Sequence, residues 1–426
     1  MLTNVFTPQI GGITRSVQQF SEQFQELGHR VLIIAPEYET DVDDPPEVMR
    51  IAAIPKFYQN LYPLPLPVVS ALLPRLREFQ PEIVHCHHPF LLGTTGQTIA
   101  ANLGIPTVYT HHTRYSVYME TKTNWPRPIE QGVLDLITGY CDLVDGIIAP
   151  SEGIKQILRD RGIGGRIEVI PTGVDVDRFS HGRGDRIREK LGLSREAFVI
   201  GHVGRLAKEK NCGFLAKAVG AFLKQNHDAV FLIVGTGAEQ KTFRKEFEDA
   251  GVLSRVHFLG FREGQDLIDA YHAMDLFAFA SHSETQGMVL GEAMAAGVPV
   301  LAVSGTGVDD IVTDGANGRV VPHDNVDQYV AALTDLKQSA MGMKDQARRT
   351  ADGISIIACA RHMVRFYQEL IDTHPQERTT EWERLRETWE TGWEIWKTHM
   401  HALATATIGT LGIEEESPSE DGTSRT

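Results

Sequence analysis

Short apolar runs alternate along this chain with polar, glycine-containing loops and longer amphipathic stretches. Three of these runs, 198–203, 231–234 and 275–280, have the length and composition of buried parallel strands. The first and the third lead through a polar loop into a stretch with helical spacing of its apolar residues. Strands that alternate with helices in this way predict an α/β protein with doubly wound parallel sheets.

The clearest of these units surrounds residues 281–299. A helix is predicted over 288–296, with Gly287 before it and Gly297 where a left-handed C-terminal cap belongs. A second apolar run follows the helix. In open α/β sheets, ligands bind where such loops leave the carboxyl ends of strands. A phosphate would therefore suit the free N–H groups at the helix start, those of Gly287, Met288 and Val289.

Two carboxylates flank this predicted phosphate site. Glu284 lies in the loop before the helix, and Glu292 lies inside the helix. Carboxylates do not bind phosphate, but they accept hydrogen bonds from sugar hydroxyls. The alternative is that Glu292 is an ordinary helix residue and Glu284 a helix-cap acid.

Length and composition are those of a globular protein with more than one domain. The 426 residues are 42% hydrophobic, and no apolar run reaches the ~18 residues that a membrane-spanning helix needs. No signal peptide is expected, since no basic start precedes an apolar stretch. The net charge of −15 argues against binding to nucleic acid. The 4 scattered cysteines indicate a reducing cytosol and argue against a zinc site.

The string from Glu284 to Val300 resembles the signature of glycosyltransferase family 4. It has two glutamates eight positions apart and ends in Glu-Ala-Met-Ala-Ala-Gly-Val-Pro-Val. Other segments extend the resemblance over most of residues 3–370. It implies a retaining enzyme that uses a nucleotide sugar and has the GT-B fold, two doubly wound Rossmann-like domains facing a central cleft. The implied parts are an acceptor-binding domain at 1–172, a nucleotide-sugar-binding domain at 173–353 and a crossover helix at 354–374.

The apolar runs indicate which segments begin and end each half of the chain as strands. The first half is expected to begin with a strand at 2–6 and to end with one at 147–151, and the second half to end with a strand at 300–303. A stretch rich in proline and aromatic residues, 57–69, is either an acceptor-site lid or an irregular crossover. Asp175-Val-Asp177 has the form of an Asp-x-Asp metal motif, which we reject because it lies in the linker between the halves.

Glycines and histidines follow the strands of the first half. Gly11-Gly12 lacks the third glycine of a dinucleotide fingerprint. It is either a tight turn or, by the resemblance, a loop that brings Gly12 to the donor phosphates. His85 and His87 alternate on one strand as metal ligands do, but no carboxylates accompany them. The segment around His88 resembles a His-x-His-x-Pro segment beside the family's cleft and is either structural or faces the acceptor.

A second histidine pair ends the strand predicted at 107–110. A histidine at a strand's carboxyl end is placed for chemistry, since its pKa lies near neutrality. The His-Thr order resembles the family's catalytic-site histidine, which implies that His112 contacts the sugar and its leaving-group side. His111 and Tyr115 then lie on the acceptor side, although the two histidines could exchange roles. The strings 109–115 and 284–288 look most like the glycolipid-synthesising branch, whose acceptor is diacylglycerol.

The loop after the strand at 198–203 contributes the basic residues. Arg205 and Lys210 are five residues apart across it, so both can converge on a diphosphate. The alternative is a solvated basic turn, which we prefer for Lys208. The resemblance assigns catalytic roles to Arg205 and Lys210, together with Glu284 and His112. It also places Gly235 and Phe261 at the nucleotide, where neither residue type selects uracil or guanine.

Beyond Pro375 the resemblance ends, and tryptophans recur at helical spacing. They predict an amphipathic helix over 381–403 whose apolar stripe is Trp382, Leu385, Trp389, Trp393, Trp396, Met400 and Leu403. This stripe has three alternative partners: the enzyme's own body, a second copy of the chain, or the head-group region of a membrane. The acidic tail from Glu414 is expected to be disordered.

These features predict a retaining hexosyltransferase, with glucose as the expected sugar and a lipid hydroxyl such as that of diacylglycerol as the acceptor. The alternatives are mannosyl or other hexosyl transfer to a soluble or polyprenyl-linked acceptor, a nucleotide-sugar epimerase on the same fold, and a silent binding protein. No cofactor or metal is expected, because the basic pair and the helix start neutralise the diphosphate. The expected location is the cytoplasm, with the inner face of the cytoplasmic membrane as a further option.

Overall fold

The computed structural model describes residues 1–9, 11–39, 43–58, 62–66, 69–117, 126–282 and 284–375. The chain divides into two compact units. The larger, residues 1–100 and 105–374, contains every strand given below. The predicted tryptophan stripe and the acidic tail lie outside the described residues. Among the described helices, none is long and apolar enough to cross a membrane.

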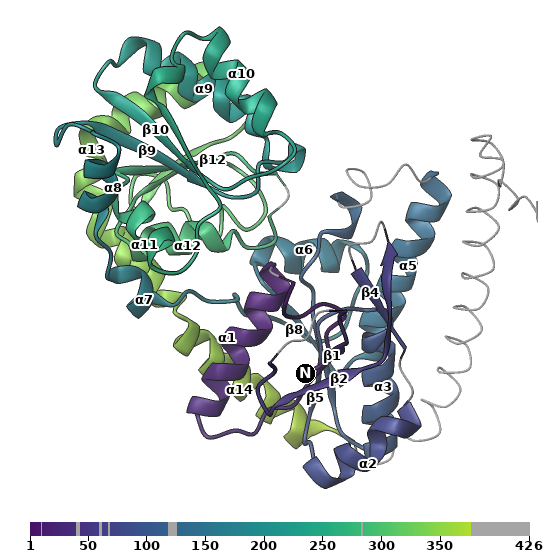
Figure 1. Ribbon diagram of the computed structural model, residues 1–426. Helices are drawn as coiled ribbons and strands as arrows, with labels where there is room; N and C mark the ends of the chain where they lie inside the picture. Colours follow the sequence, from purple (N-terminus) through teal and green to yellow (C-terminus); the bar gives the residue numbers. More distant parts are fainter. Residues whose placement is uncertain are drawn as a thin grey trace, which may run out of the picture. The chain divides into compact units, whose positions relative to one another are not determined.

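The second half of the larger unit is built on a six-stranded parallel sheet (Figure 1). Its strand order, β11-β10-β9-β12-β13-β14, is doubly wound, since the chain proceeds outward from the centre in both directions. Every residue of the four central strands is buried, as their near-continuous apolar runs predict. The strands are β9 (Phe198–Val203), β10 (Ala229–Val234), β11 (Val256–Gly260), β12 (Leu276–Phe279), β13 (Val300–Val303) and β14 (Gly318–Val321).

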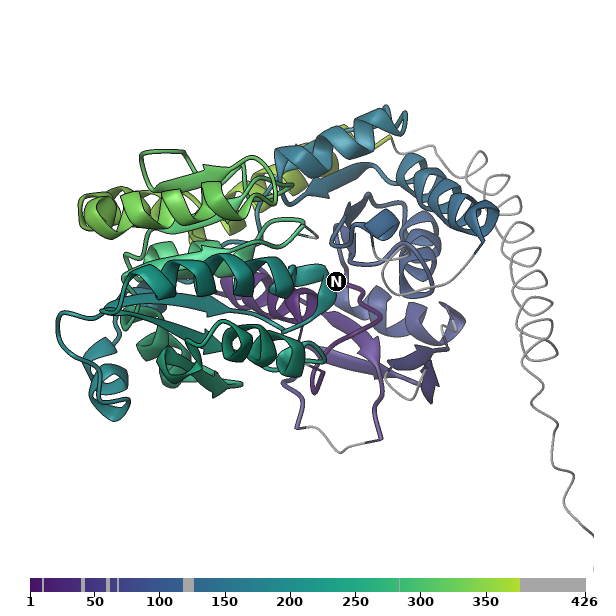
Figure 2. The ribbon, with the colours of Figure 1, turned by 90° about the horizontal axis from the view of Figure 1, so that it is seen from above.

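Alternate residues of these strands face opposite layers of helices. Val199 and Leu232 belong to one apolar cluster, with α11 and α12. Ile200 and Phe231 belong to another, with α9, α10 and α13. The two views in Figures 1 and 2 show the teal and green strands between these layers. The helices are α7 (Val176–Ser180), α8 (Gly184–Lys190), α9 (Cys212–Gln225), α10 (Gln240–Asp249), α11 (Gly264–His272), α12 (Met288–Ala295) and α13 (Val326–Gly353), with 3₁₀ turns at Lys208–Lys210 and Leu253–Arg255.

The first half has a second parallel sheet, in which four strands follow the order β5-β6-β7-β8. Leu2 bridges β1 and β5 through isolated pairings with Ile34 and Cys86, and so links the parallel pair β1-β2 to these strands. The strands are β1 (Ile33–Pro36), β2 (Val48–Ile51), β5 (Val84–Cys86), β6 (Thr107–Thr110), β7 (Gly146–Ala149) and β8 (Ile167–Val169). The helices are α1 (Gly12–Glu26), α2 (Val69–Phe79), α3 (Leu92–Leu103), α5 (Arg127–Leu143) and α6 (Glu152–Asp160).

The last helix of the larger unit, α14 (Ile356–Thr373), returns to the first half, as the resemblance implies. Its Met363 and Phe366 share an apolar cluster with Phe20 and Phe24 of α1. Ile148 of β7 belongs to the same cluster. Figure 1 shows α1 in purple beside the yellow-green α14. The core of the first half is therefore completed by a segment from near residue 360.

Four sequence predictions about strands need correction. The strand predicted at 2–6 is reduced to the bridge at Leu2, because the Asn4 side chain bonds to the loop around Phe90 and Leu92 and turns the chain. β8 follows the strand that was expected to end the first half, and β14 follows β13. Both additional strands are partly exposed and carry a charged residue, so they do not read as apolar runs. The proline-rich stretch overlaps an antiparallel hairpin of β3 (Ala53–Tyr58) and β4 (Tyr62–Pro65).

Candidate functional site

The basic and acidic residues predicted for the donor meet at the carboxyl ends of β9 and β12. The Nζ atom of Lys210 donates to Oε1 of Glu284, which lies 74 residues further along the chain. A 3₁₀ turn and the left-handed Asn211 direct Lys210 toward Glu284. Asn211 also donates from Nδ2 to Asp324 at 2.9 Å. The structure thus brings together two of the predicted catalytic residues, both partly buried.

Arg205 lies at the start of the same loop but has a different partner. Its Nη2 atom donates to Oε1 of Glu209 at 2.6 Å, and its side chain is 63% exposed. The glycine turn after β10 supports this loop. Gly235 has φ 132°, and a Cβ there would lie 1.9 Å from the carbonyl oxygen of Gly204. Only glycine therefore fits at 235, where its role is to allow close approach of the two loops.

The helix α12 begins as predicted. Gly287 is its N-cap residue, with φ 77° in the left-handed region, and Met288 and Val289 follow in its first turn. Both are half-buried. The first N–H groups of a helix have no partner within the helix, so this end can accept a phosphate oxygen. Phe261, which follows β11, exposes 51% of its surface.

Glu292 is buried inside α12, with 6% of its surface exposed. The hydroxyl of Tyr271 donates to its Oε2 atom at 2.7 Å, and Nη1 of Arg15 lies 3.8 Å from Oε1. Burial raises the pKa of the Glu292 carboxyl, whereas the Tyr271 hydrogen bond and the charge of Arg15 lower it. Arg15 lies one turn into α1, just after Gly12, and was not predicted. Its only sequence signal is its position three residues beyond the double glycine.

The histidines at the carboxyl ends of β5 and β6 form a hydrogen-bonded group in which His85 and His87 are buried. Nδ1 of His87 lies 2.9 Å from Nε2 of His112, and the His85 and His87 rings are 4.1 Å apart. Nε2 of His85 lies 2.7 Å from the hydroxyl of Thr110, and Nδ1 lies 2.5 Å from that of Tyr367 in α14. The side-chain hydrogen-bond partners of His85 and His87 are an imidazole and two hydroxyls, and the N-terminal ammonium is close enough to lower the pKa of both rings further. Over the described part of the chain, no group of three potential ligands is arranged to hold a metal ion.

Burial keeps these histidines neutral. It lowers the pKa of His112 to about 3, with further lowering by His88 and His111. A neutral imidazole has one donor and one acceptor nitrogen, so the His87 contact uses one nitrogen of His112 and leaves the other for a substrate. From the sequence, His87 was considered as a metal ligand and as part of a His-x-His-x-Pro segment that is either structural or faces the acceptor. Its contact with His112 joins two strands and has no sequence signal.

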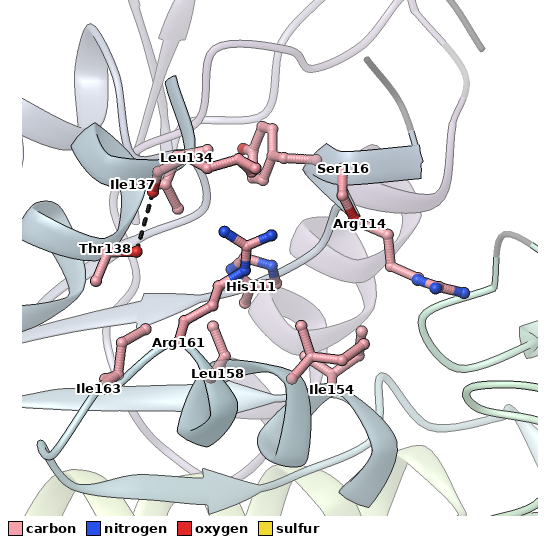
Figure 3. Close-up of a pocket in the computed structure, with 12 residues that line it drawn as sticks. His111, Arg114, Ser116, Leu134, Ile137, Thr138, Ile154, Leu158, Arg161 and Ile163 are labelled. Carbon is pink, nitrogen blue, oxygen red and sulfur yellow. Dashed lines mark hydrogen bonds between the residues drawn. The ribbon is translucent and has the colours of Figure 1, made fainter. Parts of the chain in front are cut away.

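The predicted acceptor-side residues occupy two places. Nδ1 of His88 accepts from the backbone N–H of Asn4 at 3.1 Å, so this ring anchors the N-terminal segment. His111 and Tyr115 instead line a cavity between α5 and α6, with their rings 5.6 Å apart (Figure 3).

Asp175, from the rejected metal motif, is the N-cap of α7 and accepts from the N–H of Arg178 at 3.1 Å. That contact gives Asp175 a structural task.

Two family models match the chain in succession. The model described as Glycosyltransferase Family 4 matches residues 10–178, and the one described as Glycosyl transferases group 1 matches residues 184–352. The alpha-monoglucosyldiacylglycerol synthase of Streptococcus pneumoniae is 27% identical over 344 residues, which are 78% of this chain and 77% of that protein. The GDP-mannose-dependent alpha-mannosyltransferase of Mycobacterium tuberculosis is 30% identical over 331 residues, which are 74% of this chain and 82% of that protein.

Solved structures share the fold. Sucrose-phosphate synthase from Thermosynechococcus elongatus has a TM-score of 0.69 at 20% identity, covering 85% of this chain and 94% of its own. The Anabaena protein HepE in complex with UDP-glucose has a TM-score of 0.67 at 20% identity, covering 86% of this chain and 98% of its own.

Proposed function

Because the chain belongs to glycosyltransferase family 4 and is a glycosyltransferase of the GT-B fold, we propose that it transfers glucose from a nucleoside diphosphate to a lipid hydroxyl with retention of configuration. The observation that carries this proposal is the contact between Lys210 and Glu284 beside the start of α12. It supports the proposal because a lysine, a carboxylate and the first turn of a helix lie in one loop cluster, where we infer that they bind the diphosphate and the sugar. UDP-glucose is the donor that we expect.

The proposed reaction breaks the bond between the anomeric carbon and the diphosphate oxygen, and forms one to the acceptor oxygen on the same face. Lys210, Arg205 and the N–H groups at Gly287 stabilise the charge that develops on the departing diphosphate. Glu284, once released from Lys210, accepts hydrogen bonds from the sugar hydroxyls. Glu292 holds the ribose. The proton of the acceptor hydroxyl leaves with the diphosphate.

His112 acts at the sugar in this proposal. Its low pKa keeps the imidazole neutral at physiological pH, so it binds a sugar hydroxyl as a hydrogen-bonding group and not as a cation. No metal takes part, because Lys210, Arg205 and the helix start supply the positive charge. We place the reaction in the cytoplasm at the inner face of the membrane, where a lipid acceptor and a soluble donor meet.

The similarity to two alpha-monoglucosyldiacylglycerol synthases supports the lipid acceptor. The 30% identical mannosyltransferase supports a second candidate, mannosyl transfer from GDP-mannose. A panel of UDP- and GDP-sugars, each incubated with diacylglycerol and with extracted lipids, separates the two by the mass of the product. We expect a product with UDP-glucose and lipid. An epimerised donor formed without any acceptor would contradict transfer.

A further inference from the structure

An arginine of the first half lies beside the buried carboxylate that we assign to the ribose. Arg15 belongs to the first turn of α1, where its backbone N–H donates to the carbonyl oxygen of Gly11 at 3.0 Å. Its Nη1 atom lies 3.8 Å from Oε1 of Glu292 in α12, and both residues belong to the larger compact unit. Among the described residues, Glu292 is the only ion-pair or hydrogen-bond partner of the Arg15 side chain.

The two oxygens of the Glu292 carboxylate have different surroundings. Oε2 accepts a hydrogen bond from the Tyr271 hydroxyl at 2.7 Å. The 3.8 Å between Nη1 of Arg15 and Oε1 exceeds the ~3.2 Å reach of an N–H···O hydrogen bond, so Arg15 acts on the carboxylate through its charge. No other described residue donates to Oε1. This oxygen can therefore accept a hydrogen bond from a ligand hydroxyl while Arg15 stays beside it.

The position of Glu292 inside the protein opposes the charge of its carboxylate. Burial raises the pKa of this carboxyl, whereas the Tyr271 hydrogen bond, the charge of Arg15 and, less strongly, that of Arg178 in α7 lower it. Arg15 is half-buried, but Arg178 is exposed, so solvent screens its charge. α13 also packs on α12, and its Arg348 lies at the C-terminal end of that helix. Arg15 is therefore the cation that most favours the charged form of Glu292.

We propose that Arg15 is a positioning residue of the donor site, which holds Glu292 in its charged form so that this carboxylate can accept hydrogen bonds from the ribose. The inference rests on the proposed function and deepens it, because it gives a residue of the first half a part in donor binding. A charged carboxylate accepts stronger hydrogen bonds than a neutral carboxyl, in which one oxygen carries a proton. Loss of the Arg15 charge should weaken donor binding without removing any contact to the donor.

Calorimetric titration with a nucleotide sugar, without any acceptor, tests the proposal. The probes are UDP-glucose and GDP-mannose, which both contain ribose and whose diphosphates stay fully ionised near neutral pH. We expect Arg15→Gln to bind about 10-fold more weakly than the wild type near pH ~6, because removal of the cation raises the pKa of the Glu292 carboxyl. This deficit should disappear toward pH ~8.5, where Glu292 ionises in the variant as well. The variant should also release a proton on binding near neutral pH, which appears as different heats in phosphate and Tris buffers.

Two further variants serve as controls for the charge. Arg15→Lys should bind nearly as the wild type does, because the contact depends on a positive charge and not on the guanidinium fork. Arg178→Gln removes the exposed cation on α7 and should lose at most about 2-fold.

A double-mutant cycle without any ligand tests the ion pair itself. Near pH ~8, Arg15→Gln leaves a buried carboxylate without its cation and should lower the urea midpoint of unfolding. In the Glu292→Gln background the same substitution should leave the midpoint unchanged, since no charge remains to be compensated.

Three results would overturn the proposal. If the affinities of Arg15→Gln and the wild type keep the same ratio at every pH, Arg15 either contacts the donor directly or supports only the fold. Additive midpoints in the cycle would show that Arg15 does not act through Glu292. A loss in Arg178→Gln as large as that in Arg15→Gln would mean that Arg15 has no special position.

The design keeps the proposal separate from the proposed function. If Glu292→Gln does not fold, the pH dependence of Arg15→Gln beside that of Arg15→Lys decides alone. If neither nucleotide sugar binds to the wild type, the proposed function fails, and the ligand-free cycle still decides whether Arg15 acts on Glu292.

Discussion

The ionic loops assigned to the donor and the histidine group of the first half use opposite kinds of polar contact. In the second half, charged groups are held by opposite charges, Lys210 by Glu284 and Arg205 by Glu209. In the first half, His112 and His87 are neutral imidazoles that contact each other. Ion pairs exchange partners when a charged ligand arrives, whereas a buried neutral network keeps its geometry. The donor side is therefore set to rearrange around a diphosphate, and the histidine group is formed before any substrate binds.

Removing one ion-pair partner on the donor side is expected to have the largest effect. Lys210→Ala deletes a cation that stabilises the leaving diphosphate, and turnover should fall about 10²- to 10³-fold, or ~2.7–4 kcal/mol. Initial rates at saturating donor measure it. Lys208→Ala, an exposed residue on the same turn, is the matched control and should turn over normally. Equal rates for the two variants, both folded, would show that the ion pair is only structural.

In the histidine group of the first half, His87→Phe tests whether the preformed network matters. Phe keeps an aromatic ring but cannot bond to Nε2 of His112, so the imidazole loses its fixed orientation. We expect turnover to fall about 10- to 100-fold with little change in the donor KM. His87→Asn, which retains a hydrogen-bonding group, should recover part of the loss. An increase in donor KM with unchanged turnover would contradict a positioning role.

Acid is expected to destabilise the protein through its buried histidines, which include His202 of the second half, whose pKa burial lowers to about 4. The pKa of His112 is lowered to about 3, and those of His88 and His111 to about 4, all by burial. Between these values and the ordinary pKa of about 6.5, the unfolded chain binds more protons, so the free energy of unfolding decreases as pH falls. Each such histidine contributes about 1.4 kcal/mol per pH unit over this interval. Urea unfolding at pH 7.5 and pH 5.5 measures the decrease, and His111→Phe should reduce its slope.

Chelation is expected to have the smallest effect. Transfer in excess EDTA should equal transfer without it, because Lys210, Arg205 and the helix start provide the positive charge near the diphosphate. Initial rates with and without the chelator, on enzyme dialysed beforehand, give the comparison. Activity that disappears in EDTA and returns with magnesium or manganese would mean that a cation completes the donor side.

The sequence predicted those parts of the fold in which one local pattern is sufficient. The apolar run at 300–303 and the glycines at 287 and 297 defined β13 and α12 almost to the residue. β8 and β14 were missed because Glu168 and Arg319 interrupt runs of only three and four residues. Edge strands of this kind are stabilised by pairing with a neighbouring strand, which a local pattern does not contain.

In the candidate site, too, local motifs were predicted and contacts between distant segments were not. The motif spacing was enough to name Lys210 and Glu284, and the structure brings them into contact. The motif spacing did not predict that Tyr271 donates a hydrogen bond to Glu292, or that His87 contacts His112. Each of these contacts joins two different elements, so its two residues lie 21 or 25 positions apart in the chain. No periodic pattern links positions at such separations.

The return of α14 to the first half has a consequence for synthesis of the protein on the ribosome. Phe20, Phe24 and Ile148 emerge early, yet the cluster that buries them also requires Met363 and Phe366. The hydrogen bond between His85 and the Tyr367 hydroxyl likewise cannot form until α14 has been synthesised. While the second half is being translated, the first half therefore exposes an unfinished apolar face, a natural binding site for a chaperone. A nascent chain stopped before residue 356 would have both sheets but lack the helix that completes the earlier one.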